Sequence, residues 1–210
     1  NATIRMGTQE EKLMLFESML DYRGYELVPS TKRGCKGQQE TRVEQACRNC
    51  TNIKNRQTKA RDAALENIER IIKEKNLLEN KILAIKLDTF AADRNLTGLI
   101  ANQLMAKYQR PVLLLNKTAD GWEGSGRGYD KSRFDNLREF LKDSGMIMYA
   151  EGHANALGVG ITDEWFNSFI EYSNRELAEF DFTPCYKVDF IFSGSDFRGM
   201  DIVEIAELKS

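Results

Sequence analysis

The spacing of hydrophobic positions changes along the chain and predicts where helices and strands lie. Apolar residues recur at helical intervals after Thr8, and Glu11 follows that threonine by three positions. A threonine with a glutamate three residues later is typical of a capping box, so the pattern predicts a helix over 9–21. The next stretch, 22–37, holds three glycines and one proline and is predicted to be irregular.

A long apolar stripe at helical spacing follows. Residues 38–76 contain no glycine and no proline, so the simplest interpretation is a single long helix with room for one break. A helix of this length suits a connector between two domains. We therefore divide the chain into a helical connector at 1–78, with a basic, cysteine-containing insertion at about 22–50, and an α/β domain at 79–210.

The second half of the chain alternates short apolar runs with helical patterns. Strands are predicted over 82–87, 111–115, 146–149, 159–161 and 186–192. Helices are predicted over 96–106, 134–141 and 165–180. The glycine-rich segment 122–129 is predicted to be a hairpin or loop. Alternating strands and helices with short links predict an α/β fold, a mixed β-sheet flanked by helices.

Composition indicates an ordinary globular chain: of 210 residues, 41% are hydrophobic and 30% are charged. No apolar run approaches the ~18 residues of a membrane helix, and the N-terminus has no signal-peptide pattern, so we expect no membrane contact. Four cysteines without a secretion signal favour a reducing, cytoplasmic setting. The chain starts at Asn1 and stops inside an apolar-periodic stretch, so we expect a fragment of a longer protein.

Charge is unevenly distributed although the net charge is only −2. Residues 31–61 hold nine Lys or Arg against two Glu, whereas residues 162–210 hold eleven Asp or Glu against four Lys or Arg. A basic stretch next to a mildly acidic body fits contact with nucleic acid at one end. A solvated helix face is the equally open alternative.

Two short segments carry the best candidates for phosphate binding. Gly124, Ser125, Gly126 and Arg127 combine exposed backbone N–H groups, a hydroxyl and a guanidinium fork, which suit phosphate oxygens. A simple Gly/Ser turn is the structural alternative. The second segment, 151–160, holds the only histidine of the chain among several glycines.

Glycines around that histidine suggest a tight backbone passage that lets the main chain and an imidazole approach a ligand. Its candidate ligand-binding residues are Gly152, His153 and Asn155. A histidine that merely satisfies local hydrogen bonds is the alternative.

Aromatic and cysteine side chains add weaker candidates. Trp122 and Tyr129 flank the Gly-Ser-Gly-Arg segment and could stack on unpaired bases, although core packing is the alternative for each. Cys35, Cys47 and Cys50 could contribute to a zinc site, because Cys-x-x-Cys spacing can hold Zn²⁺. If Cys47 and Cys50 lie on the long helix, their spacing instead places them on one face, where they can simply pack.

These segments together resemble the DHH-associated domain of DHH-family phosphoesterases. Residues 151–160 resemble its Gly-Gly-His-x-x-Ala-Ala-Gly signature, with Glu151 in place of the first glycine and Leu157 in place of the second alanine. Residues 124–128 resemble its Gly-Ser-Gly-Arg-Ser loop, with Gly128 in place of serine. Residues 1–7 look like the Asn-Ala-x-x-Arg-x-Gly segment that precedes the interdomain helix in RecJ-type enzymes.

The resemblance covers most of residues 1–8 and 52–195, and it implies part of a RecJ-like 5′→3′ single-strand DNA exonuclease. It implies that Arg5 receives the 5′ end of the strand and that Ser125, Arg127 and His153 contact phosphates. It also implies Mn²⁺ or Mg²⁺ in the full-length enzyme, held by the DHH domain of the same polypeptide. This chain has one histidine and no Asp-His-His triplet, so we expect it to hold no catalytic residue and no cofactor and to be inactive alone.

Two other functions remain open from the sequence. The chain could belong to a nanoRNA or small-phosphoester hydrolase of the same superfamily, with RNA or short oligonucleotides as ligands. It could also be a non-catalytic module that contacts nucleic acid or protein, because Glu151 and Gly128 depart from the family pattern.

Overall fold

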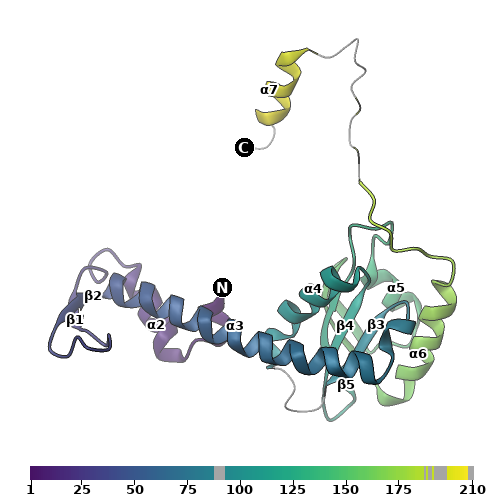
Figure 1. Ribbon diagram of the computed structural model, residues 1–210, viewed down its shortest axis with the longest axis horizontal. Coiled ribbons are helices and arrows are strands. Elements are labelled where there is room, and N and C mark those ends of the chain that lie inside the picture. Colours follow the sequence, from purple (N-terminus) through teal and green to yellow (C-terminus); the bar gives the residue numbers. More distant parts are fainter. Residues whose placement is uncertain (88–92, 187, 189–190, 192–197, 208–210) are drawn as a thin grey trace.

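A long helix joins a helical arm to a sheet domain in the computed structural model, which describes residues 1–87, 93–186, 188, 191 and 198–207 (Figure 1). The helices are α1 (Ala2–Met6), α2 (Gln9–Ser18), α3 (Arg42–Glu74), α4 (Thr97–Tyr108), α5 (Leu137–Asp143), α6 (Asp163–Glu176) and α7 (Gly199–Glu207), with short 3-10 helices η1 (Leu77–Glu79) and η2 (Arg94–Leu96). The strands are β1 (Leu27–Pro29), β2 (Gln39–Thr41), β3 (Leu83–Leu87), β4 (Val112–Lys117), β5 (Trp122–Arg127), β6 (Tyr149–His153) and β7 (Ala156–Ile161).

Capping boxes set where the two helices of the arm begin. Thr8 and Glu11 exchange both side-chain-to-backbone bonds at the start of α2, which confirms the sequence prediction there. The long helix α3 is unbroken, and it begins at Arg42 rather than near residue 38. Its start is later because Thr41 and Glu44 form a second capping box.

A short hairpin occupies the region that the sequence predicted to be irregular. Strand β1 pairs antiparallel with β2, with Leu27 opposite Thr41 and Pro29 opposite Gln39. Proline is tolerated here because the two-stranded ladder has open edges, where a missing N–H costs little. An ion pair between Glu40 of β2 and Arg48 of α3 fastens the hairpin to the long helix.

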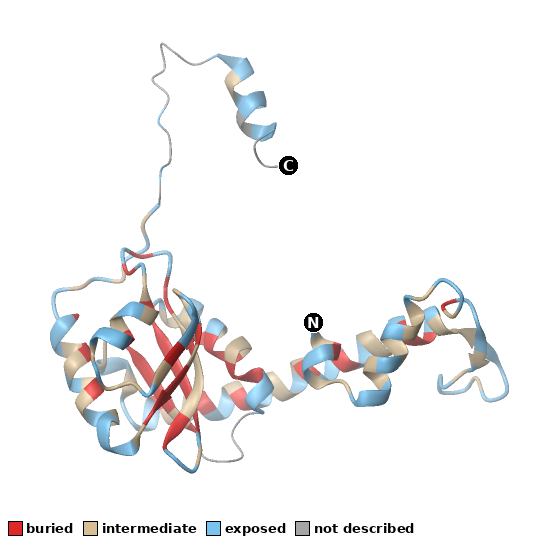
Figure 2. Ribbon diagram, turned by 180° about the vertical axis from the view of Figure 1, so that it is seen from behind, coloured by how far each residue is buried: buried red, intermediate tan, exposed pale blue. Residues whose placement is uncertain are grey.

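The five-stranded sheet has the order β3–β4–β5–β7–β6, in which only β3 and β4 run parallel. The C-terminal half of α3 and α4 cover one face of it, and their side chains form one core with β3 and β4. Helices α5 and α6 pack a second core on the other face. Figure 2 shows the buried residues concentrated in the strands and the helix faces turned toward them. The mixed sheet flanked by helices confirms the predicted fold class.

Several predicted elements shift in the structure. The strands predicted over 146–149 and 159–161 are the longer hairpin β6–β7, and the predicted loop 122–129 is mostly strand β5. The strand predicted over 186–192 falls largely outside the described residues, and Tyr186, at its start, lies in no strand. Among the described residues, no helix is long and apolar enough to cross a membrane.

An ionic cluster ties the start of α6 to the sheet. Asp163 accepts hydrogen bonds from Lys117, from the indole N–H of Trp122 and from Lys86, which together hold the pKa of its carboxyl well below its usual range. The carboxylate also lies in the first turn of a helix, where negative charge is favourable.

Replacing Asp163 with asparagine should therefore lower thermal stability at neutral pH. An unfolded aspartate titrates near pH ~3.9, so the stabilisation is complete above that pH and disappears as the pH falls through the lower folded pKa. Thermal unfolding of both proteins between neutral and strongly acidic pH should show the two midpoints converging below pH ~4. Asp143→Asn is the matched control, because no ion pair of Asp143 occurs in the described part of the chain. A constant gap between wild type and Asp163→Asn at all pH values would contradict the prediction.

Candidate functional site

The Gly-Ser-Gly-Arg segment is the middle strand of the sheet, and this corrects its predicted role as a phosphate loop. Strands β4 and β7 flank β5 on both sides, so its backbone N–H groups serve the sheet ladders. A Cβ on Gly124 would lie 1.9 Å from the carbonyl oxygen of Leu114, and one on Gly126 would lie 3.1 Å from the side chain of Leu157. Close packing, rather than a ligand, therefore accounts for both glycines.

The side chains of Ser125 and Arg127 nevertheless reach a shared position beside α4. Ser125 pairs with Leu114 and Arg127 with Val112, and both partners belong to the core beneath α3 and α4. Directly paired residues project from the same face of a sheet. Ser125 Oγ accordingly lies 2.9 Å from Oγ1 of Thr97, the first residue of α4.

The N-terminus of α4 lies against the guanidinium of Arg127. A Cβ on Gly98 would lie 2.6 Å from Nη2 of Arg127 and 3.4 Å from Oγ of Ser125. Helix α4 continues directly from η2, whose N-cap Asp93 accepts the N–H of Asn95, and the N–H of Thr97 donates to the carbonyl of Arg94. The guanidinium of Arg127, rather than free helix N–H groups, therefore favours an anion at this point.

A second guanidinium, that of Arg5 on α1, lies near Arg127. Burial lowers the pKa of Arg127, and the positive charge of Arg5 lowers it further. Neither arginine forms an ion pair with a carboxylate in the described part of the chain. Two neighbouring cations without a counter-ion repel each other, and a bound anion would relieve that repulsion.

A groove of about 530 Å³ continues from Arg5 between the arm and α4. Lys54 of α3 adds another cation to it, and its ammonium donates to Oε1 of Gln57 at 3.3 Å. The groove is lined by Asn1, Ala2, Thr3, Arg5, Leu15, Cys50, Lys54, Gln57 and Leu99.

Sequence reasoning did not single out Lys54, Thr97 or Gly98. Thr97 and Gly98 fall within the helix predicted over 96–106, which carries no local sign of a ligand. Its relation to Arg127 depends on the sheet register, which the sequence alone does not show.

The β6–β7 hairpin places His153 on the same sheet face as Arg127. Arg127 is opposite Ala156 of β7, and Ala156 is opposite His153 of β6. Two strand spacings therefore separate Arg127 from His153, which puts their Cα atoms about 10 Å apart. The imidazole is exposed. The structure thus brings Arg5, Ser125, Arg127 and His153, which the sequence nominated separately, to one side of the sheet.

Residues that pair across β5, β7 and β6 form rows on this face, and the row next to Arg127, Ala156 and His153 contains an open glycine position. Gly158 is opposite Ser125 on one side and Glu151 on the other. A Cβ on Gly158 would meet no atom closer than 3.9 Å, so none of the described residues covers this position. The third row differs, because the ring of Tyr149 would lie 2.4 Å from a Cβ on Gly160 and so covers it.

The two ends of this sheet face differ in charge. At the end that holds Tyr149, burial raises the pKa of the tyrosine, the carboxylates of Glu123 and Glu151 raise it further, and the cation of Arg94 lowers it. That end therefore has mixed charge, whereas Arg127 lies at the other end with no carboxylate paired to it in the described part of the chain.

Gly152 and Asn155 have structural roles, and their contact with a ligand stays a prediction. Gly152 adopts φ +126, and a Cβ there would lie 2.8 Å from the carbonyl oxygen of Ala156. Asn155 uses its side chain locally: Oδ1 accepts the N–H of Leu137 at 3.2 Å, and Nδ2 donates to the carbonyl of Asp135 at 2.9 Å.

The departure from the family pattern at Gly128 has a related cause. A Cβ there would lie 2.0 Å from Oδ1 of Asn155, so a serine would collide with the amide that holds the turn.

The structure does not support base stacking by Trp122 and Tyr129. Their exposed fractions are only 8% and 3%, because Trp122 packs in the core beneath α6 and Tyr129 is enclosed where the chain leaves β5. A zinc site is not supported either: no three His, Cys, Asp or Glu side chains gather within the described residues. Cys50 contacts the hydroxyl of Thr3 at 3.4 Å, Cys47 is exposed, and all four thiols are free.

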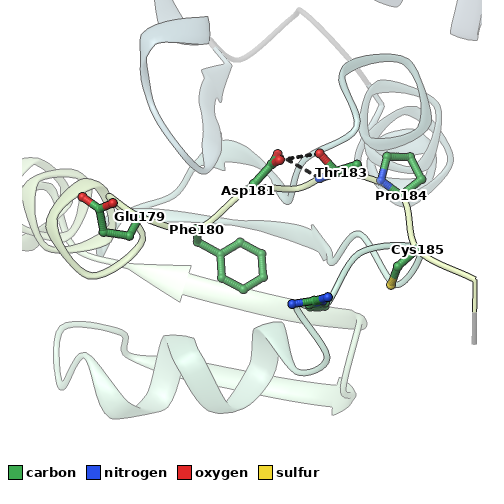
Figure 3. Close-up of a pocket in the computed structure, with 7 residues that line it drawn as sticks. Glu179, Phe180, Asp181, Thr183, Pro184 and Cys185 are labelled. Atoms are coloured by element: carbon green, nitrogen blue, oxygen red, sulfur yellow. Dashed lines mark hydrogen bonds between the residues drawn. The ribbon is translucent and has the colours of Figure 1, made fainter.

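A separate hollow of about 510 Å³ lies at the chain segment that follows α6 (Figure 3). Figure 3 shows Asp181 turned toward Thr183, from which it accepts two hydrogen bonds. Arg133 is the one cation among its lining residues, beside the acids Glu179 and Asp181. This mixed lining does not select an anion, and the hollow contains none of the residues that the sequence nominated for phosphate binding.

Comparison with known proteins shows what the chain as a whole is similar to. No family model matches the chain. Two curated proteins are 40% identical to it over 169 residues: YorK of Bacillus subtilis strain 168 and YorK of Bacillus phage SPbeta, each designated a single-strand DNA-specific exonuclease. The match covers 77% of this chain but only 28% of each relative.

Solved structures agree in fold. RecJ of Thermus thermophilus in complex with Mg²⁺ aligns over 93% of this chain and 27% of its own, with a TM-score of 0.55 and 17% identity. The Mn²⁺ complex of the same protein gives a TM-score of 0.57 at 17% identity, over 89% of this chain and 24% of its own. The chain is therefore similar in sequence to two single-strand DNA-specific exonucleases and shares the fold of part of RecJ. The structural likeness concerns the fold, and the roles of Arg5, Ser125, Arg127 and His153 in this RecJ-like chain stay predictions.

Proposed function

We propose that this RecJ-like chain is the substrate-binding half of a 5′→3′ single-strand DNA exonuclease, and that a DHH domain of the same polypeptide cleaves the bond. In this proposal Arg127 and Arg5 hold phosphates of the strand backbone. His153 adds a hydrogen-bond donor on the same side of the sheet, and Ser125 would donate to a phosphate by exchanging its present bond to Oγ1 of Thr97.

The convergence of two unpaired guanidinium groups carries the proposal. Arg127 lies on the middle strand of the sheet and Arg5 on α1, and the charge of Arg5 acts on the guanidinium of Arg127 beside the first turn of α4. A half-buried cation normally has a carboxylate partner, because burial without one is costly. A phosphate is a suitable missing partner, since a guanidinium can bind two of its oxygens at once.

The shape of the sheet face favours a single strand. Gly158 and Ala156 leave a shallow surface between Arg127 and His153, over which a flexible backbone can lie. The nominated side chains are donors suited to phosphate oxygens, which position a strand without reading its sequence. The preference for single-strand DNA follows from similarity to YorK, which is designated specific for it.

Metal chemistry does not fit the residues of this chain. Hydrolysis by two metal ions needs several carboxylate or imidazole ligands in one place. The chain has one histidine, and its described residues gather no group of three such ligands. We therefore assign Mg²⁺ or Mn²⁺ and the attacking water to the DHH domain and derive no step through them here.

The chain alone should bind 5′-phosphorylated single-stranded DNA and release no nucleotides in the presence of Mn²⁺. Binding is measured by fluorescence anisotropy, and release is measured by chromatography of the same mixture, with an intact RecJ exonuclease as the positive control for cleavage. Release of mononucleotides by the purified chain would contradict its role as a binding half. Absence of binding would contradict its role in holding the substrate. Affinity that already saturates with a dinucleotide would instead indicate a small-phosphoester hydrolase.

A further inference from the structure

We infer that the β1–β2 hairpin is a second contact for single-stranded nucleic acid, separate from the Arg127 site and reached only by longer strands. The inference rests on the proposed function, because it adds a contact to the same ligand. Its residues belong to the arm, in the segment for which the sequence offered no family counterpart.

The basic residues of the arm differ in whether a carboxylate neutralises them. Most of its arginines are neutralised: Arg23 and Arg42 pair with Glu17 and Glu26, Arg48 pairs with Glu40, and Arg56 pairs with Glu11. The cations of the loop between β1 and β2, residues 30–38, have no such ion pair in the described part of the chain.

That loop contains three basic residues and no acidic one. No ion pair of Lys32, Arg33 or Lys36 occurs in the described part of the chain, and all three side chains are exposed. Three uncompensated charges on one short loop attract a polyanion, whereas a merely solvated face would mix both signs, as the rest of the arm does.

The loop is anchored at its base and open at its tip. The N–H of Ser30 donates to the carbonyl of Gln38 at 2.9 Å, which closes the loop. At the base, the Arg48 guanidinium lowers the pKa of Glu40 to about 2, and Arg48 also bonds to Thr31. Gly34 and Gly37 adopt φ +84 and +82, and a Cβ added at either glycine would have no atom within 4 Å. The cations therefore project from a fixed base into solvent.

Two tyrosines next to the hairpin offer surfaces for bases. Tyr22 and Tyr25 lie between α2 and β1, and their exposed fractions are 77% and 80%. Exposed rings and uncompensated cations within one short segment of the arm are the usual combination for binding unpaired strands, because stacking tolerates any base. An acidic protein surface is a poorer match for this combination, because it would pair with the charges but would have no bases to stack on the tyrosine rings.

The position of the hairpin predicts which ligands it can reach. Figures 1 and 2 both show it at the far end of α3 from the sheet domain. Twelve helical residues separate Arg42, where α3 begins, from Lys54 in the groove, a distance of about 18 Å. At a spacing of about 3.4 Å for stacked nucleotides, a strand held at Arg5 needs roughly five or more further nucleotides to reach the hairpin.

The test removes the three loop charges together, as Lys32→Ala, Arg33→Ala and Lys36→Ala, and measures affinity by anisotropy with oligo-dT of two lengths. For a strand of about 16 nucleotides, affinity at low salt should fall at least about tenfold, and the slope of log K against log[salt] should shrink by about 2. For a strand of about 4 nucleotides, affinity should not change. Tyr22→Ala with Tyr25→Ala should also weaken only the longer strand, by about fivefold or more, and the Tyr→Phe pair should restore it.

A matched control removes three exposed lysines elsewhere, as Lys73→Ala, Lys75→Ala and Lys142→Ala, and should leave both affinities within about twofold. Unchanged binding of the long strand by the loop variant would overturn the inference. Equal losses for both strand lengths, or an equal loss in the control, would also overturn it. Binding of poly-glutamate as tight as that of the long strand would overturn it in favour of an acidic protein partner. If Arg127→Ala leaves binding intact while the loop variant loses it, the proposed function fails and the hairpin contact stands.

Discussion

Arg127→Ala should weaken binding of single-stranded DNA by about 10- to 150-fold, which corresponds to about 1.5–3 kcal/mol. The loss should be the same for short and long strands, because the arginine lies at the proposed primary phosphate site. The free energy of unfolding should change by only about 1 kcal/mol or less, because Arg127 makes no ion pair among the described residues, its hydrogen bond to the carbonyl of Gly126 is local, and the charge of Arg5 repels it. Anisotropy titrations and chemical denaturation of the same preparations measure both quantities.

Two further variants separate the geometry of Arg127 from its charge. Arg127→Lys should recover only part of the affinity, because lysine keeps the charge but lacks the planar fork that binds two phosphate oxygens. Arg175→Ala is the matched control, since this exposed arginine lies on α6, whose core is on the other face of the sheet. Wild-type affinity in Arg127→Ala would remove the main support for the proposed function.

Gly124→Ala should destabilise the fold by about 3 kcal/mol or more, a large part of the stability of a typical domain. The added Cβ would lie 1.9 Å from the carbonyl oxygen of Leu114 and 3.0 Å from Cα of Leu115. Both are backbone atoms of β4, so relief requires the central strands to separate. Denaturant unfolding followed by tryptophan fluorescence measures the effect.

Gly158→Ala on the adjacent strand is the matched control for this change. Its Cβ would meet no atom closer than 3.9 Å, so its free energy of unfolding should stay within about 1 kcal/mol of wild type. Equal stability of the Gly124 and Gly158 variants would show that β4 and β5 do not approach as closely as described.

Individual candidate residues show how far the sequence could predict the site. Arg127, Ser125 and His153 were nominated from local motifs, and the register of β5, β7 and β6 brings them to one sheet face. The sequence predicts ligand contact for the glycines around them. In the structure, most of these glycines lie so close to a neighbouring strand or side chain that a Cβ would collide with it. A glycine in a motif shows that the position has no side chain, but only the packed structure shows whether a ligand or a neighbouring residue fills the space beside it.

The sequence by itself determined the long helix α3, the capping box at Thr8 and the buried strands β3 and β4. These elements depend on local signals: helical periodicity without glycine or proline, a side chain that caps its own helix, and unbroken apolar runs. Tertiary structure decided that a glycine-rich segment is the middle strand and that Trp122 and Tyr129 are buried. It also decided which cations of the arm remain unpaired. Each of these outcomes depends on contacts between residues far apart in the chain, and no local pattern encodes them.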